Sequence, residues 1–201
     1  MPTLTIQPST KDTFIQANAP TSNRGSYTYL EAYAYTNALT RTLIEFDLSS
    51  LPGGATITSV TLWLYYWLYE DNDPVGFTMR VHRLRRADWE ELQSTWNIYK
   101  TGSNWGTAGA ANTTTDIDTS FQSDAVVPAD YGWMSWDVKL LAEDAVANRS
   151  NKLIARIHDT GASAYRGTFW HSKEYADDLS LRPKLVIGYT VKGKSYGFII
   201  D

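Results

Sequence analysis

Residues 60–69 constrain the fold more than any other segment, because they alternate between two apolar faces. Successive side chains of a β-strand point to opposite faces of its sheet. One face is mainly aliphatic and consists of Val60, Leu62, Leu64, Tyr66 and Leu68. The other face consists of Thr61, Trp63, Tyr65, Trp67 and Tyr69. The aliphatic face is the better core face, so the pattern predicts a row of four large rings on the opposite side of the sheet.

A second aromatic row is predicted in segment 27–36. Tyr27, Tyr29, Tyr33 and Tyr35 share one parity, and Leu30, Ala32 and Ala34 share the other. Aromatic rings with a polar group suit a half-exposed contact surface. The partner is a polysaccharide, whose flat rings stack on aromatic side chains, or a protein, because Tyr and Trp are also frequent at protein interfaces. The alternative is that a loop such as residues 101–125 covers the rings and completes a second small core.

The rest of the chain also shows short strands separated by turn signals. Segments 28–36 and 41–48 are expected to form a hairpin, and 77–84 to be the return partner of 56–69. Segments 152–158, 168–171 and 184–191 are further strands, whereas residues 101–125 are predicted as a long surface loop. One short helix, which Asp137 would cap, is predicted from the apolar positions Val138, Leu141, Ala142, Ala145 and Val146. The sequence therefore predicts an all-β, jelly-roll-like antiparallel β-sandwich with one short helix.

A single domain is expected over residues 1–189, followed by a C-terminal extension over residues 190–201. The extension ends in Phe198, Ile199 and Ile200. It is predicted to be a strand of the same sheet or an assembly tail that adds a strand to the sheet edge of a neighbour.

Charge and composition exclude several classes of function. A net charge of −4 argues against a nucleic-acid partner, which needs a basic face. The chain has no cysteine and therefore no disulfide or thiolate metal site. No apolar stretch is long enough to span a membrane, and the N-terminal residues do not resemble a secretion signal. The expected location is a virion or an extracellular surface.

No catalytic residues are predicted. The three histidines, His82, His158 and His171, lack the spacing of a zinc site. No G-x-S-x-G elbow is present. Acidic residues do cluster at Asp88, Glu90 and Glu91, but no other glycosidase motif accompanies them.

Segment 41–65 carries a family resemblance. The run 41–52, Arg-Thr-Leu-Ile-Glu-Phe-Asp-Leu-Ser-Ser-Leu-Pro, followed by 55–65, Ala-Thr-Ile-Thr-Ser-Val-Thr-Leu-Trp-Leu-Tyr, resembles the signature of DNRLRE domains, which are close to carbohydrate-binding modules of family 96. Further matches in chain order are Asp12, Asn23-Arg24-Gly25, Trp89-Glu90, Thr95-Trp96, Trp105-Gly106, Gly109-Ala110, Trp136-Asp137-Val138, Ser172-Lys173-Glu174 and Arg182-Pro183-Lys184-Leu185-Val186-Ile187. The resemblance covers about residues 12–189 and implies a non-catalytic jelly-roll module. It departs from the family pattern in lacking a glycine in segment 148–152, after the helix.

The resemblance also implies a structural Ca²⁺, because modules of this kind often carry one. Calcium requires several converging oxygen ligands, and the candidates are Asp12, Asn23 and Asp137. The alternative is that Asp12 and Asn23 only cap turns. No other cofactor is expected.

Two functions are consistent with these features. The first is a structural surface protein, such as a virion decoration or fibre component, that binds itself or a larger protein lattice of a capsid, tail or filament. The second is a polysaccharide-binding module of a cell-surface or polysaccharide-degrading system. The aromatic rows would form the contact surface in both.

Overall fold

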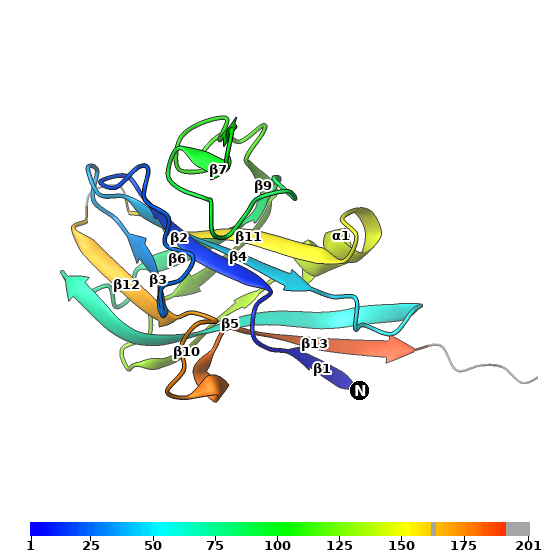
Figure 1. Cartoon of the computed structure of the whole chain (residues 1–201). Helices are drawn as coiled ribbons and strands as arrows, with labels where there is room; N and C mark the ends of the chain where they lie inside the picture. The colour runs from blue at the N-terminus through cyan, green and yellow to red at the C-terminus, as the bar shows by residue number, and fades with distance from the viewer. Residues whose placement is uncertain (162–163, 192–201) are drawn as a thin grey trace, which may run out of the picture.

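An antiparallel sheet of 11 strands curls into two packed layers in the computed structural model, which describes residues 1–161 and 164–191 (Figure 1). The first layer contains β1 (Thr3–Ile6), β13 (Lys184–Val191), β5 (Ala55–Asp71), β10 (Gly132–Asp137), β12 (Arg166–His171) and β3 (Tyr29–Tyr33). The second layer contains β2 (Lys11–Gln16), β4 (Thr40–Asp47), β11 (Lys152–Asp159), β6 (Thr78–Leu84) and β9 (Ile117–Val126). The layers join where β3 meets β4 at the single pair Tyr33–Thr40.

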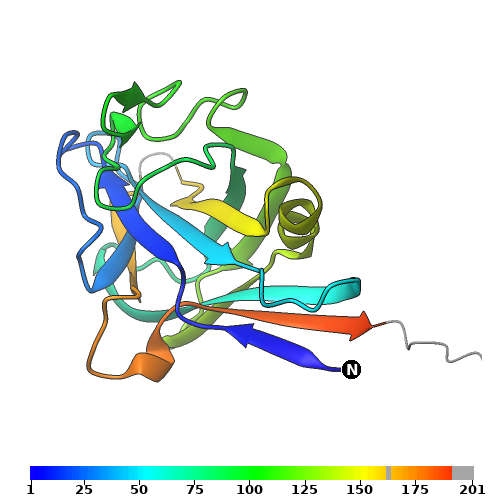
Figure 2. The same ribbon diagram turned by 45° about the vertical axis from the view of Figure 1, so that its right-hand side comes forward.

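Two smaller features complete the described chain. Strands β7 (Ile98–Lys100) and β8 (Ser103–Asn104) form a separate hairpin. Helix α1 (Lys139–Asn148) packs beside β11 and β5 at one end of the sandwich, and the 3-10 turn η1 (Leu179–Leu181) precedes β13 (Figure 2). The prediction of an all-β jelly-roll-like sandwich is confirmed, and α1 is the only α-helix among residues 1–161 and 164–191. No helix within these ranges is long and apolar enough to cross a membrane.

The main core lies between the layers. Leu62, Leu64 and Tyr66 of β5 are buried there, as the alternation of residues 60–69 predicts. Trp136 of β10 crosses the core, and its indole Nε1 donates a 2.9 Å hydrogen bond to the carbonyl oxygen of Met79 on β6. This ring therefore joins the two layers by packing and by a buried hydrogen bond.

A second, smaller core lies on the outer face of the second layer. Residues 85–117, drawn in green, fold over β2, β4, β6 and β11 (Figures 1 and 2). Trp89 and Trp105 pack there on Leu43, Leu84 and Ile154. A covering segment with its own small core was one of the two alternatives for the aromatic rows. It exists, but it covers the layer opposite to those rows.

Four expectations about elements were wrong in detail. Segments 28–36 and 41–48 do not form a regular hairpin, because β3 pairs mainly with β12 and β4 pairs with β2 and β11. Segment 77–84 is not the partner of β5, since β6 crosses to the second layer and pairs with β11 and β9. The segment 101–125 is a loop only in part, because β9 begins at Ile117. Val146 of α1 is exposed rather than buried.

Trp136→Ala is expected to lower the free energy of unfolding by about 3–5 kcal/mol, because it opens a cavity between the layers. Urea unfolding followed by circular dichroism measures this change. Leu140→Ala on the exposed side of α1 is the control and is expected to change stability by less than about 0.5 kcal/mol. A Trp136→Ala variant as stable as the control would contradict the packing of Trp136 between the two layers.

Candidate functional site

The two aromatic rows meet on the outer face of the first layer. Strand β12 lies between β5 and β3 and pairs with both. His171 and Phe169 of β12 point to the outer face, where His171 stacks on Tyr65 and Trp67 of β5 and Phe169 contacts Tyr29 of β3. The rings therefore form one aromatic band across three strands.

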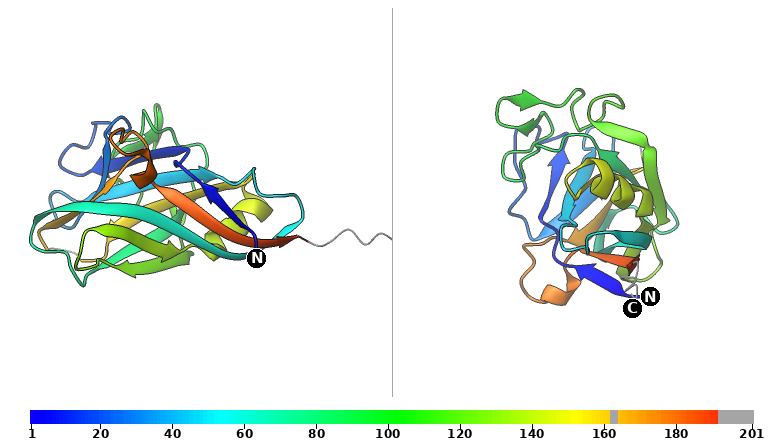
Figure 3. Two further views of the ribbon diagram at one scale, coloured as in Figure 1. Left: turned by 90° about the horizontal axis from the view of Figure 1, so that it is seen from below. Right: turned by 90° about the vertical axis from the view of Figure 1, so that its right-hand side faces the viewer.

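The β5 part of the band is half exposed. Trp63, Tyr65 and Trp67 are each partly accessible. Trp133 of the neighbouring β10 contacts the rings of Trp63 and Tyr65 edge-on. Part of the band is covered by the loop after β12, drawn in orange below β5 in Figure 1 and also in orange in Figure 3, because Tyr175 stacks on His171 at 3.6 Å. The rings of the band are therefore partly exposed to solvent and partly covered by the chain.

Tyr69 does not belong to this row. The register between β5 and β12 shifts by one residue, since Phe169 pairs with Leu68 but Trp170 pairs with Tyr66. Such a bulge reverses the alternation of the strand beyond it. Tyr69 therefore lies on the side of Tyr66, where both rings contact Tyr131.

The β3 row follows the predicted parity. Leu30, Ala32 and Ala34 point to the core. Of the four tyrosines, Tyr27 and Tyr29 are half-buried and pack on Phe14, Tyr33 is buried, and Tyr35 is exposed. Tyr33 fits because it lies against Gly167 of β12, where a Cβ atom would be only 2.5 Å from the ring. The Tyr33 hydroxyl donates to the carboxylate of Asp71.

A cleft of about 420 Å³ opens beside this row. Its rings are Tyr29, Tyr33, Tyr35, Tyr165 and Phe169. Its polar side chains are Gln16, Asn18, Glu31 and Glu70. Aromatic faces together with a few hydrogen-bonding groups are the usual lining of a small-molecule site. Both charged groups in the lining are acidic, and the nearest cation is Arg24, whose guanidinium bonds to Gln16 at the edge of the cleft.

Glu31 is a buried acid in the lining of the cleft. Its side chain is only 6% exposed, and burial raises its pKa to about 7, with a further contribution from the nearby charge of Glu70. Gln16 Nε2 donates a 3.3 Å hydrogen bond to Glu31 Oε2. At neutral pH the carboxyl group is therefore close to its midpoint, and it is held between the tyrosines and Gln16.

Several cleft residues were not predicted from the sequence. Tyr165 and Phe169 come from β12 and the segment before it, and Glu70 reaches the outer face only because of the bulge in β5. Glu31 shares the parity of the tyrosine row, and this parity was a signal that could have identified it. The tail residues Phe198, Ile199 and Ile200 lie outside the described residues.

The three predicted calcium ligands are not brought together. Asp12 is buried on β2, whereas Asp137 ends β10, where its Oδ1 accepts the N–H of Lys139 at 2.9 Å. The N-cap of α1 is Val138 rather than the predicted Asp137. Asn23 lies near Asp12 but donates both protons of its amide to the backbone carbonyls of Glu91 and Ser94. It therefore holds the 91–94 loop.

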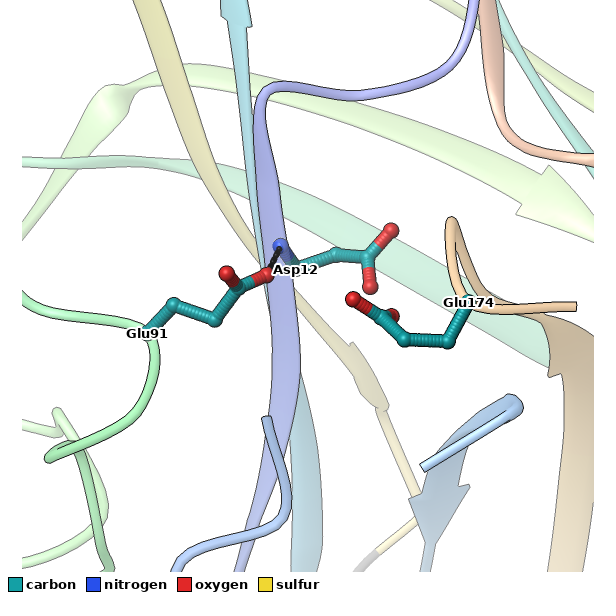
Figure 4. Close-up of side chains that lie close together, drawn as sticks. All are labelled: Asp12, Glu91 and Glu174. Carbon is teal, nitrogen blue, oxygen red and sulfur yellow. Dashed lines mark hydrogen bonds between the residues drawn. The ribbon is translucent and has the colours of Figure 1, made fainter. Parts of the chain in front are cut away.

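Two other carboxylates lie beside Asp12. Asp12, Glu91 and Glu174 each offer an oxygen within 4.8 Å of the others (Figure 4). Burial and, to a smaller extent, the charges of Glu174 and Glu91 together raise the pKa of Asp12 to about 8. The sequence motifs contained Asp12 and Glu174, but they did not show that the chain brings them together with Glu91.

The raised pKa of Glu31 predicts a pH-dependent stability. The folded state favours the protonated form, so stability is lost as the pH rises from about 4.5 to about 7, by on the order of 3 kcal/mol. Glu31→Gln keeps the shape and stays neutral, so its melting temperature is expected to fall less over this range. Thermal unfolding from pH 4.5 to 7.5 measures the difference. Glu143→Gln on the exposed side of α1 is the control, and equal slopes for wild type and Glu31→Gln would contradict the assignment.

The amino-acid sequence matches the model of a known protein family. The comparison with curated proteins gives no match. The family model described as carbohydrate-binding module family 96 matches residues 3–189, from the first residue of β1 into β13. The match agrees with the motif resemblance and with the sandwich fold. The chain belongs to carbohydrate-binding module family 96.

Proposed function

We propose that the protein is a non-catalytic module that binds a polysaccharide in the tyrosine-lined cleft beside β3. The observation that carries this proposal is the cleft itself, about 420 Å³ in volume, in which five aromatic rings surround four hydrogen-bonding side chains. Ring faces suit the apolar faces of sugars, and carboxylates and amides suit hydroxyl groups. The family match supports this function over that of a virion structural protein, which was the first expectation.

The charge of the cleft favours an uncharged polysaccharide. The acidic groups of its lining, Glu31 and Glu70, would repel uronate or sulfate groups, and burying a second negative charge beside Glu31 is costly. Hydroxyl groups of a neutral sugar would instead donate hydrogen bonds to the exposed carboxylate of Glu70. The aromatic band on β5 continues the same face and would contact further sugar units of a longer chain.

The two glutamates raise an alternative, because glycosidases also place a pair of carboxyl groups in a sugar-binding cleft. Glu31 is almost fully buried and hydrogen-bonded to Gln16, which leaves it poorly placed to reach a glycosidic oxygen. We therefore expect no new reducing ends after prolonged incubation of the protein with any polysaccharide that it binds. Release of reducing ends that Glu31→Gln abolishes would instead establish a hydrolase.

Tyr35→Ala and Tyr165→Ala are each expected to weaken polysaccharide binding about fivefold, since each removes one stacking ring worth about 1 kcal/mol. Isothermal titration calorimetry against neutral and uronate-containing polysaccharides measures both affinity and selectivity. Tyr131→Ala is the matched control, because Tyr131 is also exposed but lies outside the cleft. The proposal fails if no polysaccharide binds, or if Tyr131→Ala weakens binding as much as the cleft variants.

Trp63→Ala tests the role of the aromatic band. If the band contacts the outer units of a bound chain, this variant weakens binding of long oligosaccharides but not of short ones. A series of increasing chain length, followed by tryptophan fluorescence, separates the two contributions. Equal loss for all lengths would indicate that Trp63 only supports the fold.

A further inference from the structure

We propose that Asp12, Glu91 and Glu174 form a site for a divalent cation, with Ca²⁺ as the chemical class that fits. The site lies in the first half of β2, away from the residues that line the tyrosine cleft. It connects three segments that are far apart in the sequence. The proposal does not depend on polysaccharide binding.

The buried carboxylate of Asp12 is the main observation. Its side chain is 1% exposed. Oδ2 accepts hydrogen bonds from the hydroxyl of Ser9 at 2.5 Å and from the N–H of Lys173 at 3.0 Å, whereas Oδ1 is buried without a partner. An unpaired carboxylate oxygen in the interior is costly, so it requires a proton donor or a cation.

Glu174 supplies a second buried oxygen without a partner. Its Oε1 pairs with the ammonium of Lys173, while Oε2 has no hydrogen bond. Figure 4 shows the carboxylates of Asp12 and Glu174 turned toward each other. Two such oxygens on facing side chains repel each other when both are ionised, so a shared proton or a bound cation must lie between them.

Glu91 is held in place by its surroundings. Its Oε1 accepts the backbone N–H of Asp12 at 2.7 Å, and Asn23 fixes its carbonyl oxygen. Gly25 allows this close approach, since a Cβ atom there would lie 2.5 Å from the Glu91 carbonyl oxygen. The position of the third carboxylate is therefore built into the fold.

Charge and size both favour calcium. Lys173 is the cation that pairs with Glu91 and Glu174, and once a metal ion displaces the proton of Asp12, one ammonium beside three carboxylates leaves two negative charges. A divalent cation balances these. Calcium binds oxygen at 2.3–2.6 Å, so ligands on opposite sides of the ion are roughly 5 Å apart, which matches the 4.8 Å limit of this cluster. Calcium also tolerates irregular ligand sets, whereas magnesium requires near-octahedral geometry.

The test is a direct titration of the full chain. After EDTA treatment and desalting, CaCl₂ is titrated by calorimetry, and TbCl₃ is titrated while the emission sensitised by neighbouring tryptophans such as Trp89 is recorded. We expect one ion per chain and a higher melting temperature with calcium. Absence of heat, of sensitised emission and of a thermal shift up to about 5 mM calcium, beyond the range of weak extracellular sites, overturns the proposal.

Variants locate the ion. Asp12→Asn and Glu174→Gln are expected to weaken calcium binding tenfold or more, and Asn23→Ala, a positioning change, by about tenfold. Asp137→Asn is the control and keeps wild-type affinity, because Asp137 lies at the end of β10, outside the cluster. Near-UV circular dichroism confirms that each variant is folded. Equal calcium affinity in wild type, Asp12→Asn and Glu174→Gln would place the ion elsewhere and refute this site.

Discussion

The pairing of β5 on both edges is the constraint on which the rest of the structure depends. The strand pairs with β13 along its first half, with β10 in its centre and with β12 at its end. Its inner face supplies Leu62 and Leu64 to the main core, and a slip by one residue would exchange them with Trp63 and Tyr65. Because the core cannot accept that exchange, the large rings must remain on the outer face.

The bulge in β5 determines how the outer face is used. With unbroken alternation, Tyr69 would extend the row of rings, and Glu70 would point toward the core layer. The register shift opposite Phe169 and Trp170 places Tyr69 beside Tyr131 and turns Glu70 into the cleft. Without this register shift, the outer face would carry a continuous aromatic row. With it, the face carries a cleft that is lined by both rings and acids.

Local pattern predicted the elements well but not their partners. The alternation in β5 and β3, the closing strands and α1 follow from side-chain period and turn residues, which act over a few positions. Pairing depends on contacts between distant segments, so β6 was assigned to β5 although it lies in the other layer. The bulge has no sequence signature here, and for that reason Tyr69 was predicted in the wrong place and Glu70 was missed.

The candidate site was likewise predicted only in part from the sequence. The tyrosines of β3 were found from parity, but Tyr165 and Phe169 reach the cleft from a strand that is more than 120 residues away in sequence. Asp12 was named as a calcium ligand together with Asn23 and Asp137, but the structure places Glu91 and Glu174 beside it instead. Convergence of Glu91 and Glu174 on Asp12 depends on how residues 85–117 and 172–175 close over the sheet. No short motif encodes that arrangement.

The two outer faces of the sandwich differ in how completely other segments of the chain cover them. The second layer is sealed by residues 85–117, which bury Trp89 and Trp105 in a core of their own. The first layer is covered only in part, by the loop that carries Tyr175. Both covering segments begin next to the acidic cluster, since Glu91 lies in one and Glu174 precedes Tyr175 in the other. A cation between them would fix the segment that seals one face and the segment that borders the aromatic band on the other. One buried and two partly buried carboxylates are costly on their own, and this double anchoring would give a physical reason for the fold to retain them.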